Sequence, residues 1–160
     1  PLLLKGMKKG DARRKVSPMF EQFGLVGTQK KYPSQLSGGM RQRAALLRTY
    51  MFSKDVALLD EPFSALDTIT KSSMHRWYLN VMEQIRMSTL FITHDIDEAI
   101  LLADRIYVMS RRPGTIREVM EVNIPGERNH EILVTPEFLA MKRKIMEMLW
   151  QESQDAALDK

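Results

Sequence analysis

Two adjacent carboxylates, Asp60 and Glu61, directly follow a short apolar run at 56–59. Such a run is typical of a buried strand, and ligands gather at the carboxyl ends of strands in parallel sheets. One strand end cannot present both carboxylates to a ligand in the same way, so we expect them to divide the work. Asp60 would hold Mg²⁺, a hard cation that prefers carboxylate and water oxygens, and Glu61 would polarise an attacking water as a general base. The alternative is a strand followed by solvated acids in a turn.

A serine followed by two glycines, Ser37, Gly38 and Gly39, stands at the predicted start of a helix. Consecutive backbone N–H groups with no Cβ to obstruct them, together with the positive end of the helix dipole, make a site suited to a phosphate. The alternative is a serine N-cap followed by flexible glycines.

A histidine, His94, follows another apolar run at 89–93. At the carboxyl end of a strand its imidazole could hydrogen-bond a terminal phosphate and the attacking water. The alternative is a structural histidine whose ring is satisfied by its neighbours.

Helices and strands alternate along the chain, as judged from the period of the apolar residues. We expect helices at 11–23, 38–52, 74–85, 95–103 and 138–150, and strands at 56–59, 89–93, 105–109 and 115–122. This alternation predicts an α/β class with a mostly parallel sheet. The polar residues after 150 are expected to fray.

The composition is that of an ordinary globular protein: 160 residues, 44% hydrophobic and 28% charged. The absence of cysteine excludes a disulfide framework, a thiolate zinc site and a cysteine nucleophile. Residues 1–50 hold eleven Lys and Arg against two acids, a charge of +9, and the remaining 110 residues hold 13 basic against 18 acidic residues, a charge of −5. The basic half could face nucleic acid, anionic lipid or nucleotide phosphates, or be a solvated helix face; only two aromatic residues lie near it, which disfavours nucleic acid.

Four motifs in order make the sequence resemble the ATP-binding subunit of ABC transporters. The family's signature motif corresponds to 36–43, its Walker B strand to 56–61, its D-loop to 64–67 and its switch histidine to His94. The resemblance covers 1–125 and leaves the tail unassigned. Within the family, the methionine at position 40 and the segment 112–116 resemble the sequences of the importer branch for nitrate, sulfonate, taurine and related solutes.

The resemblance implies an α/β fold of the P-loop NTPase class, an ABC-type nucleotide-binding domain, with ATP and Mg²⁺ as ligands. In the family, two subunits sandwich two ATP molecules head to tail. Ser37, Gly38 and Gly39 would then contact the γ-phosphate of ATP held by the opposite subunit, and Asp67 would cross the dimer interface. Asp60, Glu61 and His94 would act on ATP held by their own subunit. The further partners implied are a transmembrane permease and, indirectly, a solute-binding protein, at the cytoplasmic face of the membrane, with no nucleic acid.

The phosphate loop of the family, Gly-x-x-x-x-Gly-Lys-Ser/Thr, does not occur in these 160 residues. We therefore expect the chain to be the carboxyl-terminal part of an ATPase subunit and to be inactive alone. The expected parts are a helical subdomain with the signature motif at 1–53, a partial ATPase core at 54–122 and a tail with one helix at 123–160. In the family, the strand before the phosphate loop lies between those expected here at 89–93 and 105–109, and without it their inner edges would be unpaired. The chain could close this gap, exchange segments with a second copy or leave the region disordered. The unpaired edges are expected to promote segment exchange with a second copy.

Two other functions stay open at this point. A soluble ABC ATPase of DNA repair or of ribosomes would need a coiled-coil insertion or tandem cassettes, and the sequence shows neither. A non-catalytic interaction module is favoured by the missing phosphate loop.

Overall fold

The computed structural model describes residues 1–53 and 55–158, with the side chains of 152, 153 and 155–158 excepted. It divides into two compact units, Pro1–Ile92 and Thr93–Lys160. The three-part organisation expected from the motifs (1–53, 54–122 and 123–160) stays a prediction.

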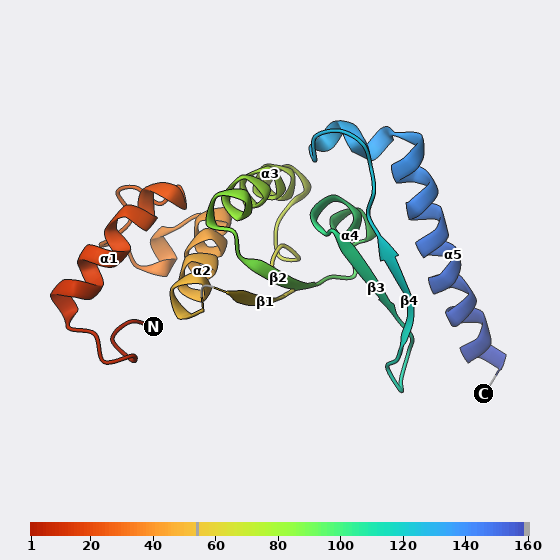
Figure 1. The fold of residues 1–160 in the computed structure, drawn as a ribbon, viewed down its shortest axis with the longest axis horizontal. Helices are drawn as coiled ribbons and strands as arrows, with labels where there is room; N and C mark the ends of the chain where they lie inside the picture. The colour runs from red at the N-terminus through yellow and green to blue at the C-terminus, as the bar shows by residue number, and fades with distance from the viewer. Residues whose placement is uncertain (54, 159–160) are drawn as a thin grey trace. The chain divides into compact units, whose positions relative to one another are not determined.

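The first unit contains three helices and one pair of strands (Figure 1). The elements are α1 (Lys9–Gln22), α2 (Gly38–Phe52), β1 (Val56–Asp60), α3 (Thr68–Ile85) and β2 (Ser88–Ile92), with a short 3₁₀ turn, η1 (Pro33–Gln35). Two polar residues set where α2 and α3 begin: the Ser37 hydroxyl accepts a hydrogen bond from the Met40 N–H, and the Asp67 carboxylate accepts one from the Thr70 N–H. Both helices therefore begin with their first N–H groups turned toward a polar cap.

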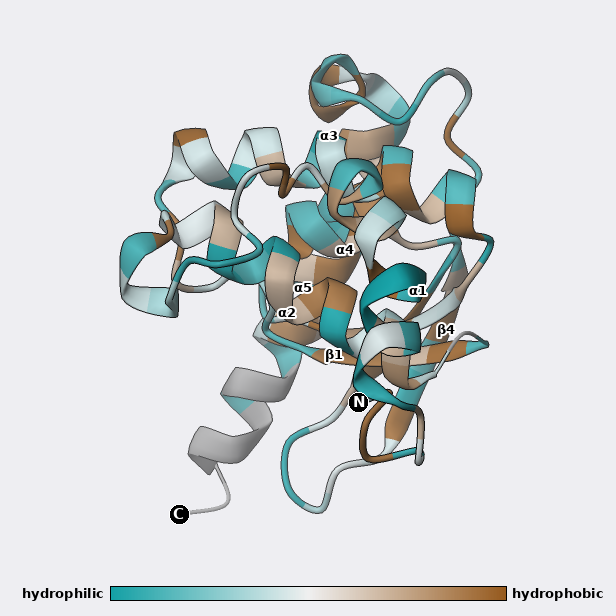
Figure 2. Ribbon diagram, turned by 90° about the vertical axis from the view of Figure 1, so that its left-hand side faces the viewer, coloured by the Kyte–Doolittle hydropathy of each residue, from teal (hydrophilic) through white to brown (hydrophobic). Residues whose placement is uncertain are grey.

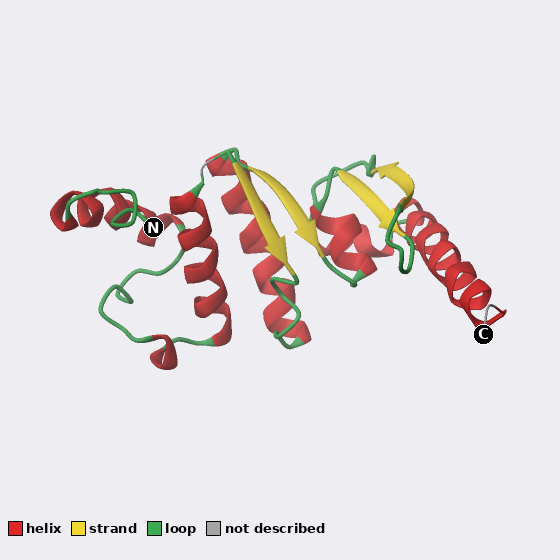
Figure 3. Cartoon of the chain, turned by 90° about the horizontal axis from the view of Figure 1, so that it is seen from below, coloured by secondary structure: helices red, strands yellow, loops and turns green. Residues whose placement is uncertain are grey.

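The two strands of the first unit are parallel and in register, Val56 beside Ser88 and Asp60 beside Ile92. Figures 1 and 3 together show α3 lying over one face of this pair. On that face Phe91 of β2 contacts Tyr78 of α3 and Phe63, with ring centroids 6.0 and 5.8 Å apart. Figure 2 colours much of β1 as hydrophobic, and on the face of β1 away from α3 Leu58 is 71% exposed.

An aromatic and cationic contact holds the three helices of the first unit together. The guanidinium of Arg43 lies 4.9 Å from the ring centroid of Trp77, and Phe23 packs against the same ring at 5.9 Å. Gly24 follows in the left-handed region, with φ +64°, and a Cβ there would stand 2.5 Å from Arg43 Nη1. Burial lowers the pKa of Arg43 from its ordinary value.

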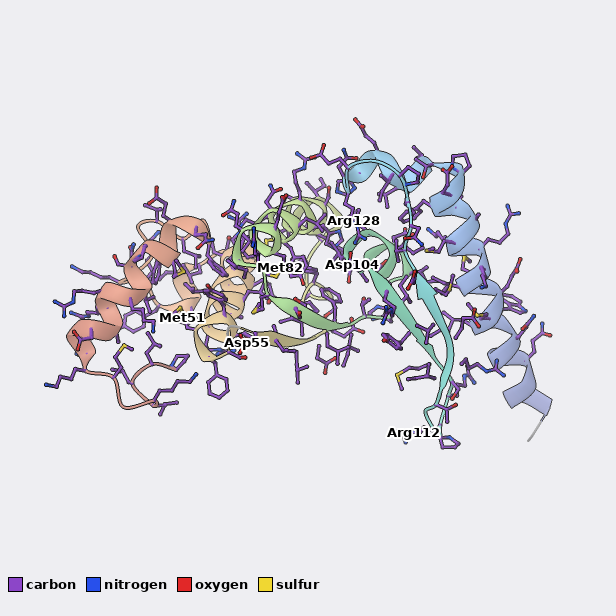
Figure 4. The ribbon with its side chains drawn as sticks, viewed as in Figure 1. Met51, Asp55, Met82, Asp104, Arg112 and Arg128 are labelled. Atoms are coloured by element: carbon purple, nitrogen blue, oxygen red, sulfur yellow. The ribbon has the colours of Figure 1, made fainter. Side chains whose placement is uncertain are left out.

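The second unit has a hydrophobic core of its own. Its elements are α4 (Ile96–Leu102), β3 (Arg105–Met109), β4 (Ile116–Glu121), the 3₁₀ turn η2 (His130–Val134) and α5 (Pro136–Leu158). Residues from all five elements form one buried cluster, including Ile100, Val108, Met120, Ile132 and Phe138. Arg128 fixes the segment before η2 by donating to the Ala103 carbonyl at 2.7 Å and to the Asp104 carboxylate at 2.9 Å (Figure 4).

Two expectations about this part of the chain are corrected. The sheet is parallel only for β1 and β2; β3 and β4 form an antiparallel hairpin, because the short Pro113-Gly114 turn leaves no room for the crossover that a parallel pair needs. The last helix does not end near 150 but continues to Leu158. β2 and β3 belong to different two-stranded sheets, and the exchange of segments expected between two copies stays a prediction.

Across the part of the chain that the structure describes, we find no helix of the length and apolarity that crossing a membrane requires.

Candidate functional site

The predicted phosphate contact is the first turn of α2. Ser37 is exposed and caps the helix, with its Oγ 3.3 Å from the Met40 nitrogen. A second hydrogen bond, from Arg41 Nη1 to the Leu36 carbonyl at 2.7 Å, fixes the residue before the cap. The turn is therefore held from both sides, and it carries the two glycines that follow Ser37.

Packing does not explain why both of these residues are glycine. A Cβ on Gly38 would lie 3.4 Å from Leu66 Cδ2, and one on Gly39 would lie 3.4 Å from Met74 Sδ. Both are ordinary contacts, and neither glycine has a positive φ. An alanine would therefore fit at either position, whereas a ligand that approaches the backbone closely would favour glycine.

The same contacts bring the signature turn against the predicted D-loop. Leu66, which a Cβ on Gly38 would touch, directly precedes the α3 cap Asp67. Hydrogen bonds from the side chain and then the backbone of Thr70 lower the pKa of Asp67, so this exposed carboxylate is ionised at neutral pH. Two of the four motifs thus lie side by side within the first unit.

The two predicted catalytic carboxylates lie at the end of β1. Asp60 is the last residue of the strand and is exposed, on the same face as Leu58. Glu61 adopts φ +48°, a left-handed backbone that residues with a side chain rarely take, and its N–H donates to the Ile92 carbonyl at 2.9 Å. Such strain is retained where surrounding structure imposes it, and it often marks functional positions. No single-sequence pattern predicts this backbone.

A metal would need ligands besides these carboxylates. Among the residues that the structure describes, no group of three or more His, Asp or Glu side chains could hold a metal ion. Mg²⁺ commonly binds through one or two carboxylates together with substrate phosphates and water. Asp60 fits that kind of site, in which the metal arrives with the phosphates of its substrate.

His94 belongs to the second unit, in the turn that leads into α4. The exposed histidine is flanked by two anchored residues: the Asp95 N–H donates to Thr93 Oγ1 at 3.0 Å, and Asp95 Oδ1 accepts from the N–H groups of Asp97 and Glu98 at 3.0 and 3.2 Å. This turn therefore has a defined backbone on either side of the imidazole.

Glu98, whose side chain binds Thr93 in this turn, was not identified from the sequence. Glu98 is 2% exposed, and its Oε2 accepts a hydrogen bond from Thr93 Oγ1 at 2.8 Å. The signal was present in the Asp95-x-x-Glu98 spacing, which resembles a capping box at a helix start. A glutamate in an amphipathic helix is nevertheless expected at the surface.

The chain has many similar proteins, and a family model described as "ABC transporter" matches residues 4–64. The formylaminopyrimidine import ATP-binding protein ThiZ of Halalkalibacterium halodurans is 40% identical over 157 residues, which are 96% of this chain and 62% of that protein. The nitrate import ATP-binding protein NrtD of Synechocystis sp. is 38% identical over 154 residues, 92% of this chain and 58% of that protein. The chain belongs to the ABC transporter ATP-binding proteins.

Further comparisons agree with this ABC assignment. The aliphatic sulfonates import ATP-binding protein SsuB of Bacillus cereus is 40% identical over 141 residues, 88% of this chain and 55% of that protein. A solved dimer of the ATP-binding cassette MJ0796, bound to ADP and Pi, superposes with a TM-score of 0.55 at 24% identity, covering 73% of this chain and 50% of the other. The fold is thus that of an ABC ATP-binding domain in part, and the chain spans 55 to 62% of the length of these three import proteins.

Proposed function

We propose that the chain contributes the signature and Walker B motifs to an ATP-hydrolysing subunit that drives the import of a small solute. The observation that carries the proposal is the arrangement at the end of β1. There a strained Glu61 follows Asp60, in the unit where the signature turn packs beside the D-loop. Proteins of 38–40% identity with this chain are import ATP-binding proteins, which supports the direction of transport.

Glu61 would act as the general base of hydrolysis. Its carboxylate would take a proton from a water whose oxygen attacks the γ-phosphorus of ATP, while the bond from that phosphorus to the ADP oxygen breaks. The hydrogen bond from the Glu61 N–H to the Ile92 carbonyl fixes the backbone from which the Glu61 side chain extends. A fixed backbone favours a constant position of the carboxylate relative to the substrate. His94 would donate a hydrogen bond to the γ-phosphate and help to orient the same water.

Asp60 would hold the Mg²⁺ that accompanies ATP. A metal held there would supply electrostatic stabilisation of the phosphate oxygens. Because the described residues form no larger ligand cluster, the triphosphate and water would complete the coordination.

The signature turn would act on ATP held by a second subunit. The N–H groups of Gly38 and Gly39 and the hydroxyl of Ser37 are suited to the γ-phosphate at the positive end of α2. Asp67, ionised and exposed, would lie at the contact between the two subunits. The solved MJ0796 structure is a dimer, which supports two subunits as the working unit.

The remaining partners follow from importer function. ATP hydrolysis would be coupled to a transmembrane permease. A solute-binding protein would act indirectly, through that permease. The subunit would lie at the cytoplasmic face of the membrane. The solute would be small, in the range that the relatives' names span: nitrate, aliphatic sulfonates and formylaminopyrimidine.

This chain by itself would not turn over ATP, because its 160 residues contain no phosphate loop and preorganised contacts to the transferring phosphate supply much of the rate. The test compares the chain with a chimera in which the phosphate-loop half of the Halalkalibacterium halodurans relative precedes it. We expect turnover by the chimera only. Turnover by the chain alone that Glu61→Gln abolishes would contradict inactivity, and a folded chimera that neither binds nor hydrolyses ATP would support the non-catalytic interaction module instead.

A further inference from the structure

Helix α5 has two apolar faces, although only one of them is packed. Phe138 and Ile145 are buried in the core of the second unit, and Met141 and Met148 pack against that core. On the opposite side, Leu139, Met146 and Trp150 are 49, 52 and 68% exposed. A surface helix normally carries one apolar stripe, so the second one is unexplained by the fold of this unit.

The exposed side has a defined set of residues. A shallow hollow of about 600 Å³ lies along it and is lined by α5 residues alone, among them Leu139, Arg143, Met146, Glu147 and Trp150. These five residues are here called the α5 stripe. At 100° per residue their directions span about 100° on one side of the helix. The three apolar residues Met146, Leu139 and Trp150 are adjacent at one edge of this span, and Glu147 is at the other.

We propose that the α5 stripe is a contact between two copies of this chain, paired antiparallel about a two-fold axis near residue 145. In that arrangement a residue i of one helix lies level with residue 290 − i of the other, because a two-fold contact is reciprocal. Leu139 then lies within one residue's rise, about 1.5 Å, of Trp150 of the second copy at each end of the contact. The two Met146 side chains meet next to the axis.

Charge complementarity selects this occupant and this direction. A two-fold antiparallel pair brings the same edge of both helices together, so Arg143 lies level with Glu147 of the second copy, and the pair occurs twice. A parallel pair would instead place the two Arg143 side chains at one level near the seam, where like charges repel. Lys142, on the other edge, is bound to Asp97 of its own chain at 2.7 Å, so its charge is already balanced.

The contact is small, and this sets the affinity to expect. From Leu139 to Trp150 the stripe extends over about 16 Å, which is short of the interface of a permanent dimer. The dimer should therefore be weak, reversible and dependent on concentration. The dimer needs no nucleotide and uses none of the residues proposed to bind ATP. A test of this dimer is therefore independent of the proposed function.

The experiment is sedimentation velocity of the 160-residue chain over a wide range of concentration, without nucleotide and at low salt. Arg143→Glu should weaken the dimer about tenfold by placing two glutamates at one level, and the double variant Arg143→Glu/Glu147→Arg should restore it to within about threefold. Trp150→Ala should weaken it at least about tenfold. The control, Val134→Ala, removes an apolar side chain that is 77% exposed outside the stripe and should change nothing.

Three outcomes would overturn the proposal. One is a chain that stays monomeric at every concentration. Another is a dimer that the Arg143→Glu and Trp150→Ala variants leave unchanged, as exchange of strands between copies would give. The third is a charge-swapped double variant that is folded, by its circular dichroism, and is no more dimeric than Arg143→Glu. Vesicles of anionic lipid added to the monomer would identify a membrane as the occupant if Trp150→Ala abolished their binding.

Discussion

Both units place a two-stranded sheet against helices, and both leave apolar side chains on the other face of that sheet. In the first unit these are Val56, Leu58, Leu90 and Ile92 of the parallel pair. In the second unit they are Tyr107, Met109, Ile116 and Val119 of the antiparallel hairpin.

The same exposure has different meanings in the two units. Antiparallel sheets commonly have one face in solvent, whereas parallel sheets occur with both faces covered. The second unit is thus an ordinary hairpin with one core, centred on α4 and α5. The first unit carries most of the proposed site, and the exposed face of its parallel pair is of the kind that another layer of structure normally covers.

The largest effect should come from the core of the second unit. Phe138→Ala should lower the free energy of unfolding of that unit by about 3–5 kcal/mol, because the ring is almost completely buried. Hydrogen exchange should report the loss in α4, β3 and β4. The matched control is Leu139→Ala, a truncation of the neighbouring, half-exposed side chain. Equal loss of protection in β1 and α3 would show that the units do not fold separately.

A smaller but still large effect should come from the proposed base in the first unit. In the chimera, Glu61→Gln should reduce ATP turnover at least about 10²-fold, since an amide cannot accept the proton. Binding of ATP, followed by a fluorescent analogue, should be retained. Glu83→Gln, an exposed change on α3, controls for loss of charge. Wild-type turnover in the Glu61 variant would remove Glu61 from the base role.

An intermediate effect should come from the buried glutamate beside His94. Glu98→Ala should destabilise the second unit by about 1–3 kcal/mol, because the Thr93 hydroxyl would lose its buried acceptor. Glu98→Gln keeps an acceptor and should cost less. Urea denaturation of the unaltered chain, of Thr93→Val, of Glu98→Ala and of the double variant Thr93→Val/Glu98→Ala gives the coupling. A double variant as unstable as the sum of separate losses would contradict a direct Thr93–Glu98 interaction.

The smallest effect should come from the uncovered face of the parallel pair. Leu58→Thr should change the stability of this chain by no more than about 0.5 kcal/mol, because the side chain is mostly in solvent. Leu59→Thr, one residue along and buried, should cost several times more. Equal costs at 58 and 59, measured by urea denaturation, would mean that another layer already covers Leu58.

The elements that carry their own end signals were predictable from sequence. The predicted helix at 38–52 agrees with α2 because Ser37 caps it, and β1 and β2 agree to within a residue because apolar runs bounded by polar residues define them. Helix α3 begins at Thr68 rather than 74, since its first turn is polar and is set by the Asp67 cap instead of by apolar periodicity. The pairing of β3 with β4 depended on loop length, which the expectation of a parallel sheet ignored.

The candidate site divides in the same way. Asp60, Glu61 and His94 were predictable because their residue types follow predicted strands, and Ser37 because it precedes a predicted helix. The order of the four motifs then joined them into one candidate site. The left-handed backbone of Glu61 was not predictable, since it depends on the Ile92 carbonyl from another strand. The burial of Glu98 was missed because a hydroxyl five residues earlier satisfies it.

The contact between Arg43 and Trp77 also gives the protein an internal optical reporter. The sequence has two tryptophans, and the structure places Trp77 in the first unit and Trp150 in the second. The ring of Trp77 lies under a cation and beside Phe23, and its indole N–H is buried with no hydrogen-bond partner among the described residues, whereas Trp150 faces solvent. Emission from Trp77 should therefore lie at shorter wavelength than emission from Trp150. Unfolding of each unit can then be followed in one unlabelled sample, with Trp77→Phe and Trp150→Phe separating the two signals.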